Sequence, residues 1–237
     1  MTGNDTRIPQ RANRHEQTTA HPRENVMIAP VTYSLLSVDR VEPTARAYTE
    51  VFVRDEPMTC RHTIDVDTFF RYARRYVHYC ADASLSIIAE DTASSECAGF
   101  ILCCDMATDI SALEPEMAEF LSIFPDSVAI IDALEQNYLP MDMALPGTTL
   151  HIYQIGVRDN YRKQAVATNL IYRICDHAKD WDFRHIVADC TSPVSCHTFE
   201  RCGFQPLGSI PYDSFYFNGR KFFSGLDGGI SLVMREL

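Results

Sequence analysis

Apolar residues recur along the chain at two different spacings, and these spacings predict strands and helices. Short continuous apolar runs are typical of buried strands, and apolar positions three and four residues apart are typical of one helix face. Strands are predicted at 31–37, 85–90, 98–104, 149–157, 185–190 and 230–236, and helices at about 42–52, 65–80, 165–180 and 195–202. This order predicts a mixed α/β domain with helices on both faces of one sheet.

Two further segments deviate from this simple pattern. Residues 105–148 hold two helical patterns, at 114–124 and 128–138, which four prolines interrupt. The segment is too short and too often broken to form a domain, so we predict an excursion from the core that serves as a lid or an acceptor wall. In the strand-rich aromatic tail, Asn218-Gly219 predicts the turn of a β-hairpin.

Composition permits one globular domain over residues 31–237. With 237 residues and 46% hydrophobic content, the chain can bury a core without disulfides. No apolar run approaches the ~18 residues of a membrane span. Residues 1–30 are polar and lack the apolar segment of a secretory signal, so they predict a disordered leader on a cytoplasmic protein. The nine cysteines include no Cys-x-x-Cys pair. We therefore expect buried reduced thiols, and no metal, because the histidines also lack ligand spacing.

The formal net charge of −11 restricts the partners of the protein. A strongly acidic surface repels nucleic acid and anionic membranes, so neither is expected to bind. The same surface attracts cations, including protonated amines, although it could equally serve solubility alone. We expect a monomer or a weak dimer.

A basic loop joins the predicted strand 149–157 to the helix that starts near residue 165. Backbone N–H groups at a helix N-terminus point outward and carry partial positive charge, so they bind phosphate readily. Arg158, Arg162 and Lys163 add a local positive spot to the acidic chain. Taken alone, the loop fits either an anion-binding site or an ordinary helix start with a basic first turn.

This loop and a second segment downstream resemble the GNAT family of N-acyltransferases. The family's acyl-CoA loop reads Gln/Arg-x-x-Gly-x-Gly/Ala, and Arg162, Ala165 and Ala167 occupy the three positions, with alanine in place of the first glycine. Residues 190–204 resemble the family's strand and short helix that end in Glu-Arg-x-Gly-Phe. The resemblance covers residues 31–237. It implies the GNAT fold, whose mostly antiparallel central sheet is splayed in the middle, and acetyl-CoA as co-substrate. The CoA-binding residues that it implies are Ile155, Val157, Arg162, Lys163, Gln164, Ala165, Val166, Ala167 and Ser192.

Residues 55–58, Asp-Glu-Pro-Met, resemble the Asp-Glu-Pro-Leu motif of the insect-type arylalkylamine N-acyltransferases. In that subfamily the glutamate is the general base, and two hydroxyl residues four positions apart assist it. The resemblance implies catalytic roles for Glu56, Thr191 and Ser195, and an oxyanion-binding role for the N–H of Val157. The expected acceptor-binding residues are Asp55, Met58 and Phe215.

Amine acylation explains why these residue types are needed. An alkylamine has a pKa of about 10, so it must lose a proton before it attacks a thioester, and a carboxylate such as Glu56 can take that proton. Phe199 stands where many GNAT members carry a tyrosine acid, which leaves protonation of the thiolate to Ser195 or Thr191. We predict an acyl-CoA-dependent N-acyltransferase that acetylates a small primary amine of the arylalkylamine or polyamine type.

Two alternatives remain open. A protein lysine N-acetyltransferase would also suit the acidic surface. A non-catalytic acyl-CoA-binding regulatory module would explain why Lys163 and Ala165 stand at positions that the family often fills with glycine. Single residues also have simpler interpretations, with Glu56 as a solvated turn residue and Ser195 as a helix N-cap.

Overall fold

The computed structural model describes residues 30–237, so the leader predicted for residues 1–30 lies outside the described residues except at Pro30. Seven strands form one sheet in the order β1-β2-β3-β4-β5-β7-β6. They are β1 (Val31–Leu35), β2 (Ile87–Asp91), β3 (Cys97–Asp105), β4 (Thr149–Val157), β5 (His185–Cys190), β6 (Gln205–Pro211) and β7 (Gly229–Glu236). All neighbours are antiparallel except β4 and β5, which are parallel.

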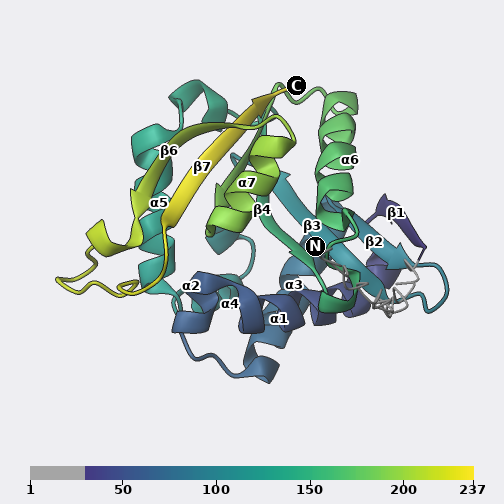
Figure 1. The fold of residues 1–237 in the computed structure, drawn as a ribbon, viewed down its shortest axis with the longest axis horizontal. Helices are drawn as coiled ribbons and strands as arrows, with labels where there is room; N and C mark the ends of the chain where they lie inside the picture. The colour runs from purple at the N-terminus through teal and green to yellow at the C-terminus, as the bar shows by residue number, and fades with distance from the viewer. Residues whose placement is uncertain (1–29) are drawn as a thin grey trace, which may run out of the picture.

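Helices cover both faces of this sheet (Figure 1). The helices are α1 (Val41–Asp55), α2 (Pro57–Arg61), α3 (Val66–Ala83), α4 (Pro115–Leu121), α5 (Pro125–Tyr138), α6 (Val166–Asp180) and α7 (Pro193–Arg201). Short 3-10 turns lie at η1 (Val38–Arg40), η2 (Ile110–Ala112), η3 (Met141–Ala144), η4 (Asp159–Tyr161) and η5 (Tyr212–Ser214). The predicted α/β architecture is confirmed.

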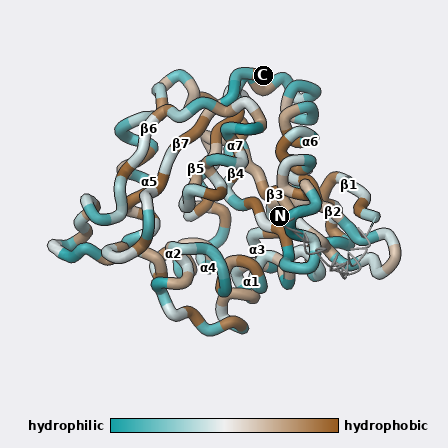
Figure 2. Tube along the Cα trace, viewed as in Figure 1, coloured by the Kyte–Doolittle hydropathy of each residue, from teal (hydrophilic) through white to brown (hydrophobic). Residues whose placement is uncertain are grey.

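Each face of the sheet has its own core. Residues of α6 and α7 pack on one face, where Leu170 and Ile174 meet Ile101 and Ile152. Residues of α1, α3 and α4 pack on the other face, and α2 and α5 join a third apolar cluster beside β5 and β7. Figure 2 shows the apolar, brown stretches along β3, β4 and α6 in the interior. This arrangement follows from the spacing of apolar residues along the chain.

The sheet opens between β4 and β5. Ile152 and Ala188 form the last paired position of the two parallel strands. Beyond this position β4 continues to Val157 alongside β3, and β5 continues to Cys190 alongside β7. The two strands therefore diverge in a V, which is the splay that the family resemblance implies.

Residues 105–148 do not stand apart from the core. Met117, Phe120 and Phe124 belong to the core cluster of α1 and α3. Ile130 and Leu134 of α5 are fully buried beside β7. The segment is thus an integrated part of the domain, and its two predicted helices are present as α4 and α5.

The aromatic tail differs from the predicted hairpin. The turn exists, because Asn218 and Gly219 both have positive φ, 48° and 76°, and Phe217 and Arg220 form an isolated antiparallel bridge. No strand flanks this turn within the described residues. The neighbouring rings pack individually instead: Phe223 is fully buried, whereas Tyr216 is exposed.

Two further expectations concern helices and cysteines. Within residues 30–237, no helix is long and apolar enough to cross a membrane. All nine cysteines are free thiols, and all except Cys60 and Cys196 are buried. The predicted burial is therefore confirmed for seven of the nine cysteines.

Candidate active site

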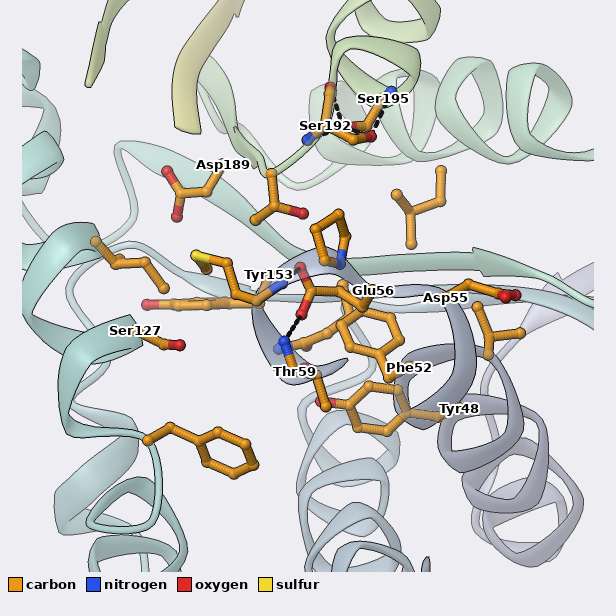
Figure 3. A pocket seen from close by; sticks show the side chains of 18 of the residues that line it. Tyr48, Phe52, Asp55, Glu56, Thr59, Ser127, Tyr153, Asp189, Ser192 and Ser195 are labelled. Atoms are coloured by element: carbon orange, nitrogen blue, oxygen red, sulfur yellow. Dashed lines mark hydrogen bonds between the residues drawn. The ribbon is translucent and has the colours of Figure 1, made fainter. Parts of the chain in front are cut away.

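A cavity of about 300 Å³ lies where β4 and β5 separate. Its sheet side is formed by residues 152–155 of β4 and by Ala188 and Asp189 of β5. The other walls come from α1, α2, the α4–α5 segment and the start of α7 (Figure 3). None of the lining residues, all of which belong to the described chain, is a lysine or an arginine. We call this space the splay cavity.

The walls of the splay cavity are largely aromatic. The rings that line it are Tyr48, Phe52, Phe69, Phe120, Phe124, Tyr153 and Phe199. Three carboxylate residues, Asp55, Glu56 and Asp189, are also in the lining. Aromatic faces and carboxylates both favour cations, so the cavity suits a positively charged acceptor with an apolar body.

Glu56 sits at the junction of α1 and α2. Pro57 starts the short helix α2, and Glu56 is the N-cap of this helix rather than a solvated turn residue. One carboxylate oxygen accepts the N–H of Met58 at 3.1 Å, and the other accepts the N–H of Thr59. Proline is suited to the first helical position, and a carboxylate satisfies the free N–H groups there. Because each oxygen has two acceptor sites, both keep one site for a ligand.

The start of α7 supplies the hydroxyl residues. Ser192 is the N-cap of α7, which corrects the interpretation of Ser195 as the cap. Ser192 and Ser195 form a capping box: each side chain accepts the other's backbone N–H, at 3.1 and 3.2 Å, and Ser195 Oγ also donates to the Ser192 carbonyl at 2.8 Å. Thr191 lines the cavity outside this box, and its carbonyl accepts the Tyr212 hydroxyl at 2.7 Å. Glu56, Thr191, Ser192 and Ser195 therefore border one cavity.

The free edge of β4 faces the opening. The N–H of Arg158 donates to Ala98 of β3 at 3.0 Å. In an antiparallel ladder, alternate residues direct their N–H groups to the same neighbour. The N–H groups of Val157 and Ile155 therefore point to the opposite side, where β5 has diverged. Ile155 lines the splay cavity, whereas Val157 lies farther along the strand toward the basic loop.

The basic loop presents unpaired backbone donors. The N–H groups of residues 163–168 find no backbone acceptor within residues 30–237. Two loop residues adopt left-handed backbone geometry, Lys163 with φ 61° and Ala165 with φ 59°. Alanine is therefore strained at position 165, because the αL region favours glycine. The loop thus holds an alanine in a backbone conformation that favours glycine.

Carboxylates already neutralise the arginines of this loop. Arg162 pairs with Asp55 of α1 and with Asp159, the latter at 2.8 Å. Arg158 pairs with Glu50 at 2.8 Å and with Glu96 at 3.3 Å. Any phosphate that binds here must therefore compete with these carboxylates for the guanidinium groups.

The three expected acceptor residues have different surroundings. Met58 is buried in the wall of the splay cavity. Asp55 borders the cavity, but its carboxylate accepts from Arg54 at 2.8 Å and pairs with Arg162, which holds its pKa below the ordinary range. Phe215 does not line the cavity and packs near Phe223, with ring centroids 6.3 Å apart.

Sequence reasoning missed a buried group of titratable residues beside the cavity. His151 of β4 is fully buried, and its Nε2 lies 2.9 Å from a carboxylate oxygen of Asp189. Its Nδ1 lies 3.9 Å from Glu135 of α5. Burial raises the pKa of Glu135 to about 7. One available signal was Asp189 itself, a charged residue inside an apolar strand.

Comparison with known proteins identifies the class. The chain belongs to the acetyltransferase (GNAT) family, whose model matches residues 49–204. The family uses acetyl-CoA, and its members are N-acetyltransferases.

Solved structures share the fold. Polyamine N-acetyltransferase of Drosophila melanogaster, which forms N-acetylagmatine, has a TM-score of 0.70 and 14% identity over 88% of this chain and 100% of that chain. Putative arylalkylamine N-acetyltransferase 7 of the yellow fever mosquito Aedes aegypti has a TM-score of 0.71 and 17% identity over 87% of each chain. The condensation domain of Ebony, solved with β-alanyl-dopamine, has a TM-score of 0.70 and 15% identity over 88% of this chain and 100% of that chain. At these identities the likeness shows the fold.

Proposed function

We propose that this protein transfers an acetyl group from acetyl-CoA to a small cationic amine, with Glu56 as the general base. One observation carries the proposal: Glu56 and the hydroxyl residues at the start of α7 border one aromatic cavity, at the opening of the sheet, that has no basic lining residue. A carboxylate in such a cavity both attracts an ammonium group and accepts its proton.

The proposed reaction needs two proton transfers. Glu56 takes one proton from the ammonium, directly or through water, and the neutral nitrogen attacks the thioester carbonyl. The tetrahedral oxyanion accepts hydrogen bonds from backbone N–H groups at the free edge of β4, and the candidate donors are Val157 and Ile155. Collapse of this intermediate breaks the C–S bond. The nitrogen then loses its second proton, and the CoA thiolate gains one. Each turnover yields the amide, the free thiol and one proton released to water.

Thr191 is the better candidate for the proton donor to the thiolate. The Ser195 hydroxyl already donates to the Ser192 carbonyl at 2.8 Å and belongs to the capping box of α7. Its use would break that hydrogen bond and weaken the helix start. The Thr191 hydroxyl lies outside the box. Phe199 lines the same cavity and has no proton to give.

On the donor side, we propose that the pantetheine arm follows the free edge of β4 past Ile155 and Val157, and that the pyrophosphate binds the loop 162–167. The unpaired N–H groups of this loop support the proposal. A second candidate is a non-catalytic acyl-CoA-binding module. The strained backbone at Lys163 and Ala165 and the paired Arg162 favour it, because they weaken the anion site.

One experiment separates these candidates. Release of the CoA thiol is followed with acetyl-CoA and a panel of arylalkylamines, diamines and a lysine-containing peptide, and binding of CoA is measured by calorimetry. The amine N-acetyltransferase predicts turnover with a small amine and little with the peptide. CoA binding without transfer to any acceptor would establish the module, and preference for the peptide would establish the protein lysine acetyltransferase.

A further inference from the structure

Asp189 has an unpaired oxygen at the wall of the splay cavity. It directly follows the last paired position of β5, and its side chain is only 7% exposed. One oxygen lies 2.9 Å from His151 Nε2. The other oxygen is buried without a hydrogen-bond partner among the described residues. A buried carboxylate oxygen that has lost water and gained no donor is costly, so this position calls for a donor from outside the chain.

The neighbouring groups leave this oxygen without a donor. His151 stands between two carboxylates, those of Asp189 and Glu135. Burial disfavours its charge, but the two carboxylates outweigh burial and raise the pKa of His151 above its ordinary value. His151 contacts only one oxygen of Asp189, and the second oxygen keeps no donor among the described residues. Since no lysine or arginine lines the cavity, a donor to this second oxygen has to come from a ligand, and a cationic group is the strongest such donor.

A metal ion fits this group poorly. Glu135, His151 and Asp189 have side chains that can ligate a metal, and their candidate ligand atoms lie within 4.8 Å of one another. However, Asp189 lies beside Nε2 of His151 whereas Glu135 lies beside Nδ1, so the two carboxylates are next to different nitrogens of the same ring. An ion bound to Nδ1 would lie close to Glu135, but the imidazole ring would separate it from Asp189. An organic cation that contacts Asp189 alone avoids this difficulty.

We infer that Asp189 binds a second cationic group of the acceptor, so that the preferred substrate is a diamine or a guanidinoalkylamine. This inference rests on the proposed function and names its substrate class. Glu56 at the start of α2 receives the reacting amine, and Asp189 on β5 receives the distal cation. Figure 3 shows the two carboxylates apart on different walls of the cavity. Aromatic rings such as Tyr153 and Phe124 line the space and suit the connecting alkyl chain.

The test compares two acceptors of equal chain length, 1,4-diaminobutane and n-butylamine, in wild-type protein and in Asp189→Asn. Hydrogen bonds to charged groups predict that wild-type kcat/KM favours the diamine by about 10- to 100-fold. Asp189→Asn is expected to lower kcat/KM for the diamine by the same factor and to change that for butylamine by less than about twofold. Asp142→Asn, an exposed position in η3 outside the cavity lining, removes the same charge and serves as the control for long-range attraction.

The outcomes distinguish the inference from the proposed function. If wild-type protein acetylates no amine, the proposed function fails and the inference falls with it. If wild-type protein acetylates butylamine as well as the diamine, or Asp189→Asn lowers both equally, the inference alone is overturned. The wild-type comparison needs no variant, so it decides the matter even if Asp189→Asn does not fold.

Discussion

Ala165 offers a direct test of the loop geometry, because it holds a backbone conformation suited to glycine. Its φ is 59° and its ψ is 17°, immediately before α6. An L-residue in this region is strained by about 1–2 kcal/mol relative to glycine. Glycine also makes the unfolded chain more flexible, which offsets about 0.5–1 kcal/mol. We therefore expect Ala165→Gly to raise the free energy of unfolding by about 0.5–1 kcal/mol.

Ala167→Gly is the matched control. The same chemical change two residues later falls inside α6, where the backbone is helical. There glycine is unfavourable, so the free energy of unfolding should fall by about 0.5–1 kcal/mol. Urea unfolding of the three proteins, with equal m-values, measures both changes. Equal losses of stability in the two variants would refute the left-handed geometry of the loop.

Two further predictions concern a buried carboxylate and the N-cap of a helix. Glu135→Gln tests the raised pKa of Glu135. The carboxyl ionises near its ordinary pKa in the unfolded chain and at about 7 in the folded protein. The free energy of unfolding of wild type should therefore fall as pH rises between these two values. The loss from Glu135 is up to about 3 kcal/mol. Urea unfolding at pH 5 and pH 8 should therefore show a larger fall in wild type than in Glu135→Gln, which keeps only the fall that the raised pKa of His151 contributes. Parallel profiles would contradict this assignment. Ser192→Ala removes the N-cap of α7 and should lower the free energy of unfolding by about 1 kcal/mol in the same assay; unchanged stability would show that the capping box does not hold this helix.

The parts of the fold that the sequence predicts well are those with strong local signals. The predicted bounds of β4 and β5 match the structure, because both are largely apolar segments that are followed by the polar residues Arg158 and Thr191. The short helix α2 was missed, because five residues show no helical period and form a helix only through Pro57 and the carboxylate of Glu56. The turn at Asn218 was predicted from its tolerance of positive φ, but its flanking strands depend on partners that are absent from the described fold.

The site, too, could be predicted from the sequence only where its residues belong to a local pattern. The motif around Glu56 and the hydroxyls near Ser195 could be named from the sequence, because each is a local pattern that resembles a family. The grouping of Glu135, His151 and Asp189 could not, because it needs the parallel pairing of β4 with β5 and the packing of α5 against them. The strain at Ala165 was likewise hidden, since φ is set by the loop as a whole.

The measurement that tests the central claim most directly is the pH dependence of kcat/KM in Glu56→Gln. Glutamine keeps an oxygen that can accept the backbone N–H groups of α2 but cannot take a proton, and Glu42→Gln on α1, outside the cavity lining, is the matched control. With Glu56 as the base, kcat/KM near pH 7 should fall by about 10²- to 10⁴-fold, with CoA affinity unchanged. The defect should shrink as pH approaches the pKa of the amine, because the substrate then arrives deprotonated. Full activity of Glu56→Gln, or a defect of equal size at every pH, would contradict the account.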